Sequence, residues 1–286
     1  MKYFFDTEFL EGQQKKLFGK TKPTIDLISI GIVSEDGRSY YAIHKDFNLK
    51  EAWNRWQPRT GQGDRNRLQP REYWLRENVL RKIYEQLFKM YAEQVEEYER
   101  HRVVYAVKGV TEFNYKNMKW LLKRFGRDSR FIANDICGFI YGDDCSGSGM
   151  MSAFEMAIKY EISDKTKEPE FYAYYADYDW VVFCWLFGNM MSLPKGFPMY
   201  CRDLKQMLDE KTEAMSHQDF EELYKGLAIN IPSEDKLTLN EKVKLIKSLP
   251  HYPKNNGEHD ALEDAKWNRE LFHFIKDTRY ELIAKP

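Results

Sequence analysis

The sequence predicts an α/β protein in which a mixed β-sheet, with an antiparallel start followed by parallel strands, is flanked by helices. Two observations support this prediction. The N-terminal part contains β-rich runs, "KYFFDTEF" and then "TIDLISIGIVSEDGRSYYAIHK", and the second run holds an antiparallel hairpin signal at Asp36 and Gly37. The rest of the chain alternates between helical patterns and short apolar runs, which is typical of a sheet covered by helices. We expect one domain over residues 1–286.

Each predicted element rests on a local pattern. The first strand begins almost at residue 1. A helix is expected from about Arg76 to Arg102, where apolar residues recur at spacings of three and four, and another over 114–126, ended by Gly126. Strands are expected at "RFIAND" and "EFYAYYA". Further helices are expected at "DWVVFCWLFGNMM", "RDLKQMLDE", "EKVKLIKSL" and "EDAKWNRELFHFI".

The composition is that of a globular protein, with 43% hydrophobic and 15% aromatic residues and a formal net charge of −1. No overall positive charge attracts nucleic acid, so a polyanionic partner would need a local basic patch or metal ions. The four cysteines have no zinc-site spacing, and no apolar run suits a signal peptide or a membrane span. We therefore expect a reduced, cytoplasmic protein that does not bind a membrane.

Carboxylates occur at three informative places, the first of which is the first strand. Asp6 and Glu8 are two residues apart, so both side chains point to the same face of that strand. Charged groups inside an aromatic-rich strand are costly to bury unless they are paired or bind a metal. The alternative is that the strand ends at Phe5 and that "DTE" is a solvated turn.

The second place is "YYADYDWVVF", where Asp177 and Asp179 lie at a strand-to-helix junction. Aspartate is common in the first turn of a helix for purely structural reasons, because it caps the helix and suits its dipole. This pattern alone therefore leaves a structural and a functional interpretation open.

The third place is "GEHDALEDAKW". A helix that begins near His259 would carry Asp264 on the same stripe as Ala261 and Asn268, while its other face packs into the core. That core face would hold Leu262, Leu271 and Ile275. The remaining acids are expected to lie in a solvated first turn; they are Glu258, Asp260 and Glu263.

Together these places supply four acidic ligands and one histidine. Ligands that offer only oxygen suit Mg²⁺ or Mn²⁺ rather than zinc. Two such ions, roughly 4 Å apart, can stabilise the attacking and leaving oxygens of a phosphodiester displacement. A neighbouring imidazole, which titrates near neutral pH, can take a proton from the attacking water.

With "FFDTEF", "ADYDWV" and "HDALED" in this order, the chain resembles the DEDD 3′–5′ exonucleases, in the subclass that has histidine in the third motif (DEDDh). Within that superfamily it is most similar to the small bacterial and phage 3′–5′ exoribonucleases called RNase AS. Supporting matches are "ISIGIV", "YWLRENVL", "MYCRDLKQ" and "EHDALEDAKWN". The resemblance covers most of the chain.

The resemblance implies an RNase H-like fold and two bound Mg²⁺ or Mn²⁺ ions. It assigns metal ligation to Asp6, Glu8, Asp179 and Asp264, and the role of general base to His259. It implies hydrolysis of single-stranded RNA from the 3′ end with release of nucleoside 5′-monophosphates. Such enzymes favour adenylate tracts and are commonly homodimers.

Asp177 remains an alternative to Asp179 as the ligand of the second motif. The family pattern favours Asp179, because there the ligand follows an aromatic residue at the start of the helix. The chain also departs from the compact family core by its length. The surplus falls in parts of 57–70, 90–112 and 135–169, which we interpret as insertions.

The family pattern suggests substrate contacts from Phe9 and Leu10, which follow Glu8, and we also expect contacts from Trp74 and Arg76. The segment 50–74 mixes basic residues with tryptophans, which suits phosphate binding and base stacking. It would equally suit a surface loop whose tryptophans anchor it in the core. Two further functions stay open, namely a 3′–5′ DNA exonuclease with the same site and a non-catalytic nucleic-acid-binding module.

Overall fold

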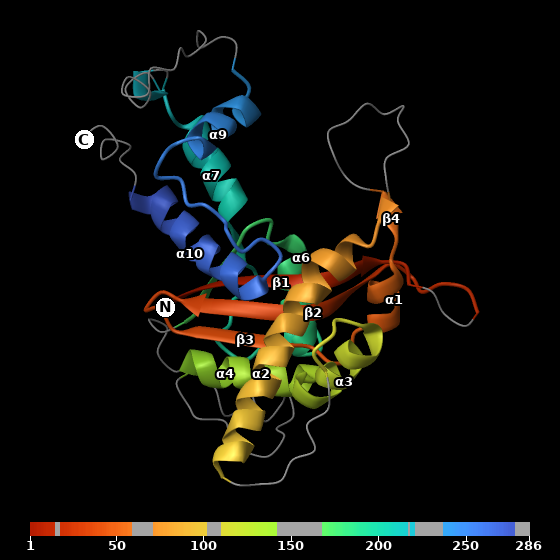
Figure 1. Ribbon diagram of the computed structural model, residues 1–286. Coiled ribbons are helices and arrows are strands. Elements are labelled where there is room, and N and C mark those ends of the chain that lie inside the picture. Colours follow the sequence, from red (N-terminus) through yellow and green to blue (C-terminus); the bar gives the residue numbers. More distant parts are fainter. Residues whose placement is uncertain are drawn as a thin grey trace.

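The centre of the molecule is a five-stranded mixed sheet (Figure 1) with the strand order β3-β2-β1-β6-β7. β1 pairs antiparallel with β2, and β2 with β3, whereas β1–β6 and β6–β7 are parallel. The predicted antiparallel start followed by parallel strands is therefore confirmed, and the arrangement is consistent with an RNase H-like fold. The strands are β1 (Lys2–Gly12), β2 (Thr24–Ser34), β3 (Ser39–Ile43), β6 (Glu170–Ala173) and β7 (Arg202–Asp203).

The computed structural model describes residues 1–14, 18–58, 71–101, 110–141, 168–216, 218–220 and 237–277. Within these ranges the remaining elements are α1 (Leu49–Asn54), β4 (Gln57–Pro58), β5 (Arg71–Glu72), a π-helical turn η1 (Arg76–Leu80), α2 (Arg81–Arg100), α3 (Tyr115–Phe125), α4 (Ser129–Tyr141), α6 (Asp177–Leu186), a 3-10 turn η4 (Met190–Ser192), α7 (Leu204–Glu213), α9 (Leu239–Lys247) and α10 (Ala261–Asp277). No helix in the described ranges is long and apolar enough to cross a membrane.

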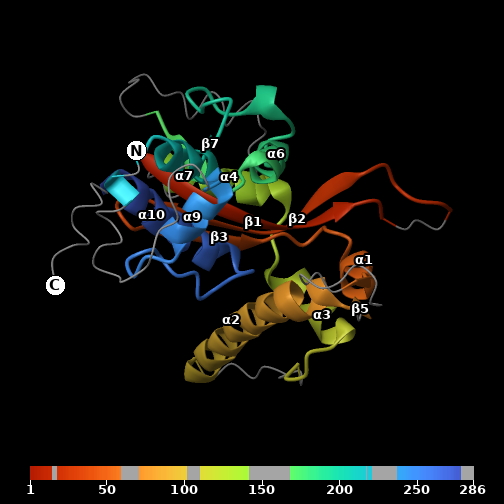
Figure 2. The same cartoon turned by 90° about the horizontal axis from the view of Figure 1, so that it is seen from above.

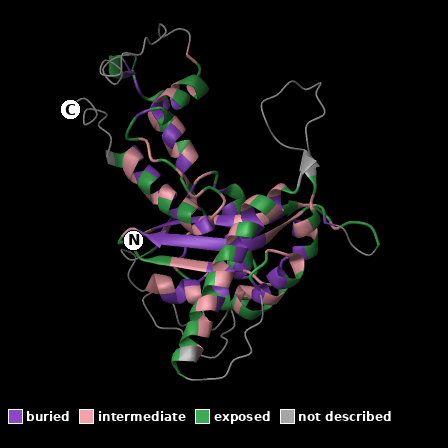
Figure 3. Cartoon of the chain, in the orientation of Figure 1, coloured by how far each residue is buried: buried purple, intermediate pink, exposed green. Residues whose placement is uncertain are grey.

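The helices cover the two faces of the sheet. Helices α1, α2 and α3 lie on one side, and α4 and α6 lie on the other (Figure 2). The central strands are buried between these layers, while the outward faces of the helices are exposed (Figure 3).

Alternation along β1 sends its side chains to separate cores. Tyr3 and Phe5 pack into the core that contains residues of α4 and α6. On the other face, Phe4 packs into the core beside α7, α9 and α10, and Leu10 packs into the core beside α1, α2 and α3. The positions between Phe4 and Leu10 on this face therefore lie where two helical layers meet, and they are occupied by Asp6 and Glu8.

One expectation about local structure is wrong. Residues 130–135, predicted as a strand, belong to helix α4, which also takes up 135–141 of a predicted insertion. The Asp128 side chain accepts hydrogen bonds from the backbone N–H groups of Arg130 and Phe131, so this helix has a capped start. Residues 90–100, part of another predicted insertion, form the last turns of α2, in agreement with the helix predicted from about Arg76 to Arg102. The remaining parts of the predicted insertions fall largely outside the described residues.

Candidate active site

Strand β1 positions the first two acids. It continues unbroken to Gly12, so the alternative in which "DTE" is a solvated turn is wrong. Asp6 lies opposite Gly31 of β2, and Glu8 lies opposite Ser29. The pairing shifts directly after Glu8, which is a bulge. Bulges re-aim side chains, and this one lies at the end of the acidic segment.

Gly31 allows helix α10 to bring Asp264 to these acids. A Cβ atom at this position would lie 2.3 Å from the backbone oxygen of Ala261, so only glycine lets the first turn of the helix rest directly on β2. Asp264 follows within this first turn. Carboxylate oxygens of Asp6, Glu8 and Asp264 all lie within 4.8 Å of one another.

Asp179 reaches the same cavity from the N-terminus of α6. It is 5% exposed, whereas Asp177 is exposed to solvent. The Asp179 Oδ1 atom accepts hydrogen bonds from the backbone nitrogen and the hydroxyl of Thr7, at 3.0 and 2.5 Å. Thr7 thus ties Asp179 to the strand between Asp6 and Glu8. Asp179 lies beside the three clustered acids, but its carboxylate oxygens are not within 4.8 Å of all three of them.

Burial and mutual repulsion disfavour the charged forms of these acids. Burial raises the pKa of Asp6 well above its ordinary range, and repulsion from Asp179 and Glu8 adds to the rise. Burial, followed by repulsion from Asp264, raises the pKa of Glu8 to about 8. Burial likewise raises the pKa of Asp179 to about 6 and raises the pKa of Asp264. The four carboxyl groups therefore resist being ionised at the same time. A positive charge among them would reduce the repulsion between the ionised carboxylates.

The residues fit a divalent cation. Within the described part of the chain, no donor forms a hydrogen bond to the carboxylate of Asp6 or Glu8. Both groups therefore keep their oxygens available, and with Asp264 they offer three converging carboxylates. A ligand set of oxygen atoms alone suits Mg²⁺ or Mn²⁺.

His259 lies at the rim of the cluster in a left-handed backbone conformation, with φ of +68°. This conformation is rare for residues other than glycine. It is held in part by the backbone N–H of His259, which donates to Asp264 Oδ2 at 3.0 Å. The imidazole ring packs edge to face against Trp74, with 4.6 Å between ring centroids. Asn255 donates to the other oxygen of Asp264, so both oxygens of this acid are oriented by its own loop.

Helix α2 holds this loop from the other side. The Lys82 ammonium group donates to the backbone oxygens of Gly257, at 3.3 Å, and of Glu258. Gln86 donates from Nε2 to Asp260 Oδ2 at 2.5 Å, while Asp260 Oδ1 accepts from the backbone N–H of Leu262. The prediction that Asp260 is solvated is therefore wrong, since it links the start of α10 to α2.

The predicted arrangement of this helix is confirmed except at Leu262. It begins at Ala261, close to His259, and Asp264 lies on the same stripe as Ala261 and Asn268. Ala261 and Asn268 are as buried as the expected core residues Leu271 and Ile275, because this side of the helix rests on the sheet. Leu262 is only half-buried, whereas Glu258 and Glu263 are exposed as expected.

A cavity of about 430 Å³ opens over the acids and has an aromatic wall. Phe9 and Tyr178 meet edge to face at 5.8 Å between ring centroids. Trp74 is on this wall as expected. Three tyrosines were missed by sequence reasoning, although the repeated tyrosines around the second motif are a usable signal; they are Tyr174, Tyr175 and Tyr178.

Two of the four predicted substrate contacts do not reach this cavity. Leu10 is fully buried in the core beside α1, α2 and α3, so it cannot touch a base. The Arg76 guanidinium lies 4.0 Å from the ring centroid of Tyr73 and pairs with Glu77 at 2.9 Å, outside the lining of the cavity. Leu10 points into the core because side chains alternate along β1. Arg76 is held outside the cavity by its contacts with Tyr73 and Glu77.

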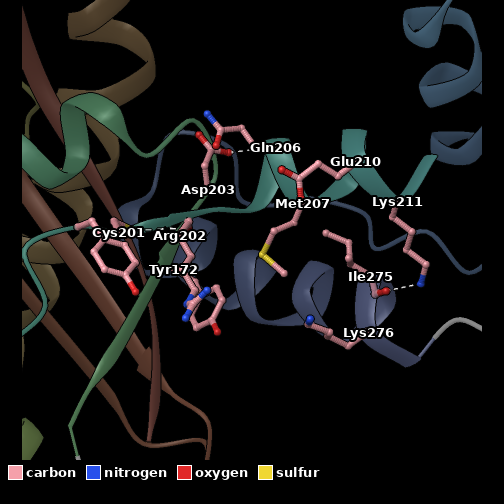
Figure 4. Close-up of a pocket in the computed structure, with 11 residues that line it drawn as sticks. Tyr172, Cys201, Arg202, Asp203, Gln206, Met207, Glu210, Lys211, Ile275 and Lys276 are labelled. Atoms are coloured by element: carbon pink, nitrogen blue, oxygen red, sulfur yellow. Dashed lines mark hydrogen bonds between the residues drawn. The ribbon is translucent and has the colours of Figure 1, made fainter. Parts of the chain in front are cut away.

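Two other cavities are present in the described residues. One, of about 630 Å³, adjoins the acids and shares Asp6, Tyr174 and Asp264 with the aromatic cavity. The other, of about 660 Å³, lies between β7, α7 and the end of α10 (Figure 4). Its lining mixes cationic Arg202, Lys211 and Lys276 with acidic residues, and it holds none of the predicted site residues.

Comparison with known proteins finds similarity to nucleases, which agrees with the cluster of carboxylates in the site. No protein-family model matches the chain. The chain is 24% identical over 211 residues to a 3′-5′ exoribonuclease of Mycobacterium tuberculosis strain CDC 1551 / Oshkosh, a match that covers 74% of this chain and 76% of that protein. It matches a 3′-5′ exoribonuclease of strain ATCC 25618 / H37Rv to the same extent. This similarity supports the resemblance to exonucleases that the motifs indicated.

Proposed function

We propose that the protein is a metal-dependent 3′–5′ exoribonuclease of the DEDDh type, closest to the RNase AS group. The observation that carries this proposal is the convergence of Asp6, Glu8 and Asp264 beneath an aromatic cavity, with His259 at the rim. The similarity to proteins named 3′-5′ exoribonuclease supports it. The substrate is single-stranded RNA, and the products are nucleoside 5′-monophosphates.

Asp6, Glu8 and Asp264 would hold two Mg²⁺ or Mn²⁺ ions, and Asp179, tied to Thr7, would complete the site. Such ions, when bound, promote ionisation of water and stabilise negative charge on a phosphoryl group. Thr7 and Asn255 fix two of the four acids, so these carboxylates would be oriented to hold the cations when they bind.

His259 acts as the general base. Its ring lines the same cavity as the acids, and contact with Trp74 restricts the ring to that position. A neutral imidazole can accept a proton from the water that attacks the terminal phosphodiester. Phe9, Trp74 and Tyr178 offer aromatic faces and edges against which an unpaired base can pack.

Further parts of the proposal concern substrate and assembly. Adenylate tracts are the favoured RNA, and the chain acts in the cytoplasm as a homodimer. It forms one exonuclease domain with insertions in roughly 57–70, 90–112 and 135–169. These statements rest on the family resemblance.

The test is a gel time course with 5′-labelled, A-tailed RNA and a matched DNA strand, in Mg²⁺, Mn²⁺ or EDTA. We expect a metal-dependent ladder that shortens from the 3′ end on RNA. Asp264→Asn should lower the rate by more than about 100-fold, because it removes a proposed direct ligand and the loss of even an outer partner of a metal site costs up to that much. Its melting temperature should stay close to that of the wild type, because asparagine can still accept the hydrogen bond from His259.

Other outcomes favour the alternatives. Faster shortening of DNA than of RNA would identify a DNA exonuclease with the same site. Intact strands in every lane, with the strand still retarded on a native gel, would identify a nucleic-acid-binding module. An active Asp264→Asn variant would mean that the third motif is assigned wrongly.

A further inference from the structure

The cavity of about 630 Å³ next to the acids differs from the aromatic cavity in its chemistry. Its distinctive lining comes from the end of α9, the loop 252–258 and α10, and includes Lys247, Lys254, Asn256 and Tyr252. Asp6, Asp264 and Tyr174 belong to both cavities, so the acids lie at the junction between an aromatic chamber and a polar, partly cationic one.

The two lysines are available to an anion. Neither Lys247 nor Lys254 forms an ion pair within the described part of the chain. Lys247 donates a hydrogen bond to the hydroxyl of Tyr174 at 2.9 Å, which holds its ammonium group beside the residue that both cavities share. Lys254 is exposed on the loop that leads to His259.

Two buried polar atoms in this lining also lack partners. Asn268 is 1% exposed and donates from Nδ2 to the backbone oxygen of Phe5 at 2.9 Å, but its Oδ1 atom has no hydrogen-bond partner among the described residues. The buried hydroxyl of Tyr252 has none there either. Unpaired buried polar groups are costly, so a ligand with hydroxyl groups would be bound favourably here.

We propose that this second cavity binds the sugar–phosphate of the nucleotide on the 5′ side of the scissile bond. This inference deepens the proposed function and rests on it. The terminal nucleotide occupies the aromatic cavity, the scissile phosphate lies over Asp6 and Asp264, and the RNA strand leaves past Lys247 and Lys254. The two lysines meet the next phosphate, and the ribose hydroxyls lie toward Tyr252 and Asn268.

A rival role for the cavity is an exit for the mononucleotide product. The p-nitrophenyl ester of a nucleoside 5′-monophosphate separates the two roles. Its hydrolysis yields the same kind of mononucleotide, but p-nitrophenol replaces the upstream nucleotide as leaving group. An exit would therefore affect the ester and RNA alike, whereas an upstream subsite affects RNA alone.

The experiment compares the wild type, Lys247→Met, Lys254→Met and the double variant on A-tailed RNA and on the ester, all in Mn²⁺. Lys244→Met is the matched control, since Lys244 is exposed on the same helix outside the cavity lining. We expect each cavity variant to raise the KM for RNA by about tenfold, as loss of a charged hydrogen bond does, with ester hydrolysis unchanged.

The salt dependence gives a second readout that a structural defect would not reproduce. For each phosphate that a variant no longer neutralises, the slope of log affinity against log salt for RNA should become shallower by about 0.7. Tyr252→Phe removes only the hydroxyl, and it should weaken binding of RNA more than binding of a strand with 2′-deoxyribose at the penultimate position.

Equal losses on RNA and ester, or no loss on RNA in the double variant, would overturn the subsite. A wild-type protein that hydrolyses neither substrate would instead refute the proposed function, and the subsite with it.

Discussion

Glu8 carries a large electrostatic penalty within the site. Its carboxylate lies among Asp6, Asp179 and Asp264, and burial is the main reason that its pKa is about 8. In the absence of a cation, the folded protein therefore holds a proton that the unfolded chain would release. Proton and metal are alternative means of relieving the same repulsion.

This competition predicts how stability depends on pH. The pKa of Glu8 is about 8 in the folded state and near 4.5 ordinarily, so its stabilising contribution is present below about pH 4.5 and is lost as the pH rises through 8. In EDTA, the melting temperature of the wild type should fall more steeply than that of Glu8→Gln between about pH 5 and pH 8.5. Thermal scans by circular dichroism measure both slopes.

Saturating Mn²⁺ should offset this loss in the wild type. A ligand at 100 times its Kd adds about 2.7 kcal/mol, which corresponds to a rise of about 4–5 °C for a chain of this size. Glu8→Gln should gain less. Parallel pH slopes for the two proteins, together with no shift in Mn²⁺, would contradict a metal site at Glu8.

Individual residues show where sequence patterns stop being informative. The two-residue spacing correctly placed Asp6 and Glu8 on one face, because that is a local property of a strand. The same alternation buries Leu10, which the family pattern had suggested for substrate binding. The bond from Thr7 to Asp179 joins residues 172 positions apart, and no local pattern reports it.

At the scale of elements, the link between α2 and the histidine loop is central to the site. Lys82 and Gln86 lie one turn apart on α2, and they hold the loop on either side of His259. Tyr41 donates to the Gln86 side chain at 2.5 Å, so the link extends to strand β3. The left-handed conformation of His259 therefore depends on three separate elements.

Removing the Lys82 ammonium group should misplace His259, the proposed general base, without unfolding the protein. We expect Lys82→Met to lower kcat by about tenfold, as for outer partners of metal sites, with KM nearly unchanged. The matched control is Lys89→Met, on an exposed position of the same helix. Steady-state kinetics on A-tailed RNA would contradict this role if KM alone changed, or if both variants behaved alike.

The wrong assignment of α4 has a physical cause. The run "RFIAND" is short and apolar, and over six residues a strand and a buried helix segment look alike. Buried positions Ile132, Ala133, Ile136 and Cys137 recur with helical spacing only when the run is followed to Tyr141. The capping carboxylate of Asp128 also lies outside this run.

At the scale of the whole molecule, the sheet assembles the site from distant parts of the sequence. β1 supplies Asp6 and Glu8, α6 supplies Asp179, and α10 supplies Asp264, with Gly31 setting the approach of α10. The motifs predicted this assembly, because the first was placed on a strand, the second at a strand-to-helix junction and the third at the start of a helix. The two cavities that meet at the acids could not be predicted, because their walls combine loops and helices that only the fold brings together.

The central claim is that these acids direct water to the 3′-terminal phosphodiester of RNA. The most direct test is to identify the products released from A-tailed RNA by chromatography against nucleotide standards. Attack by water at the terminal phosphorus, with loss of the upstream 3′ oxygen, predicts adenosine 5′-monophosphate and a shortened strand that ends in a 3′ hydroxyl, both only when Mg²⁺ or Mn²⁺ is present. Adenosine 3′-monophosphate or a 2′,3′-cyclic phosphate, formed equally well in EDTA, would contradict it.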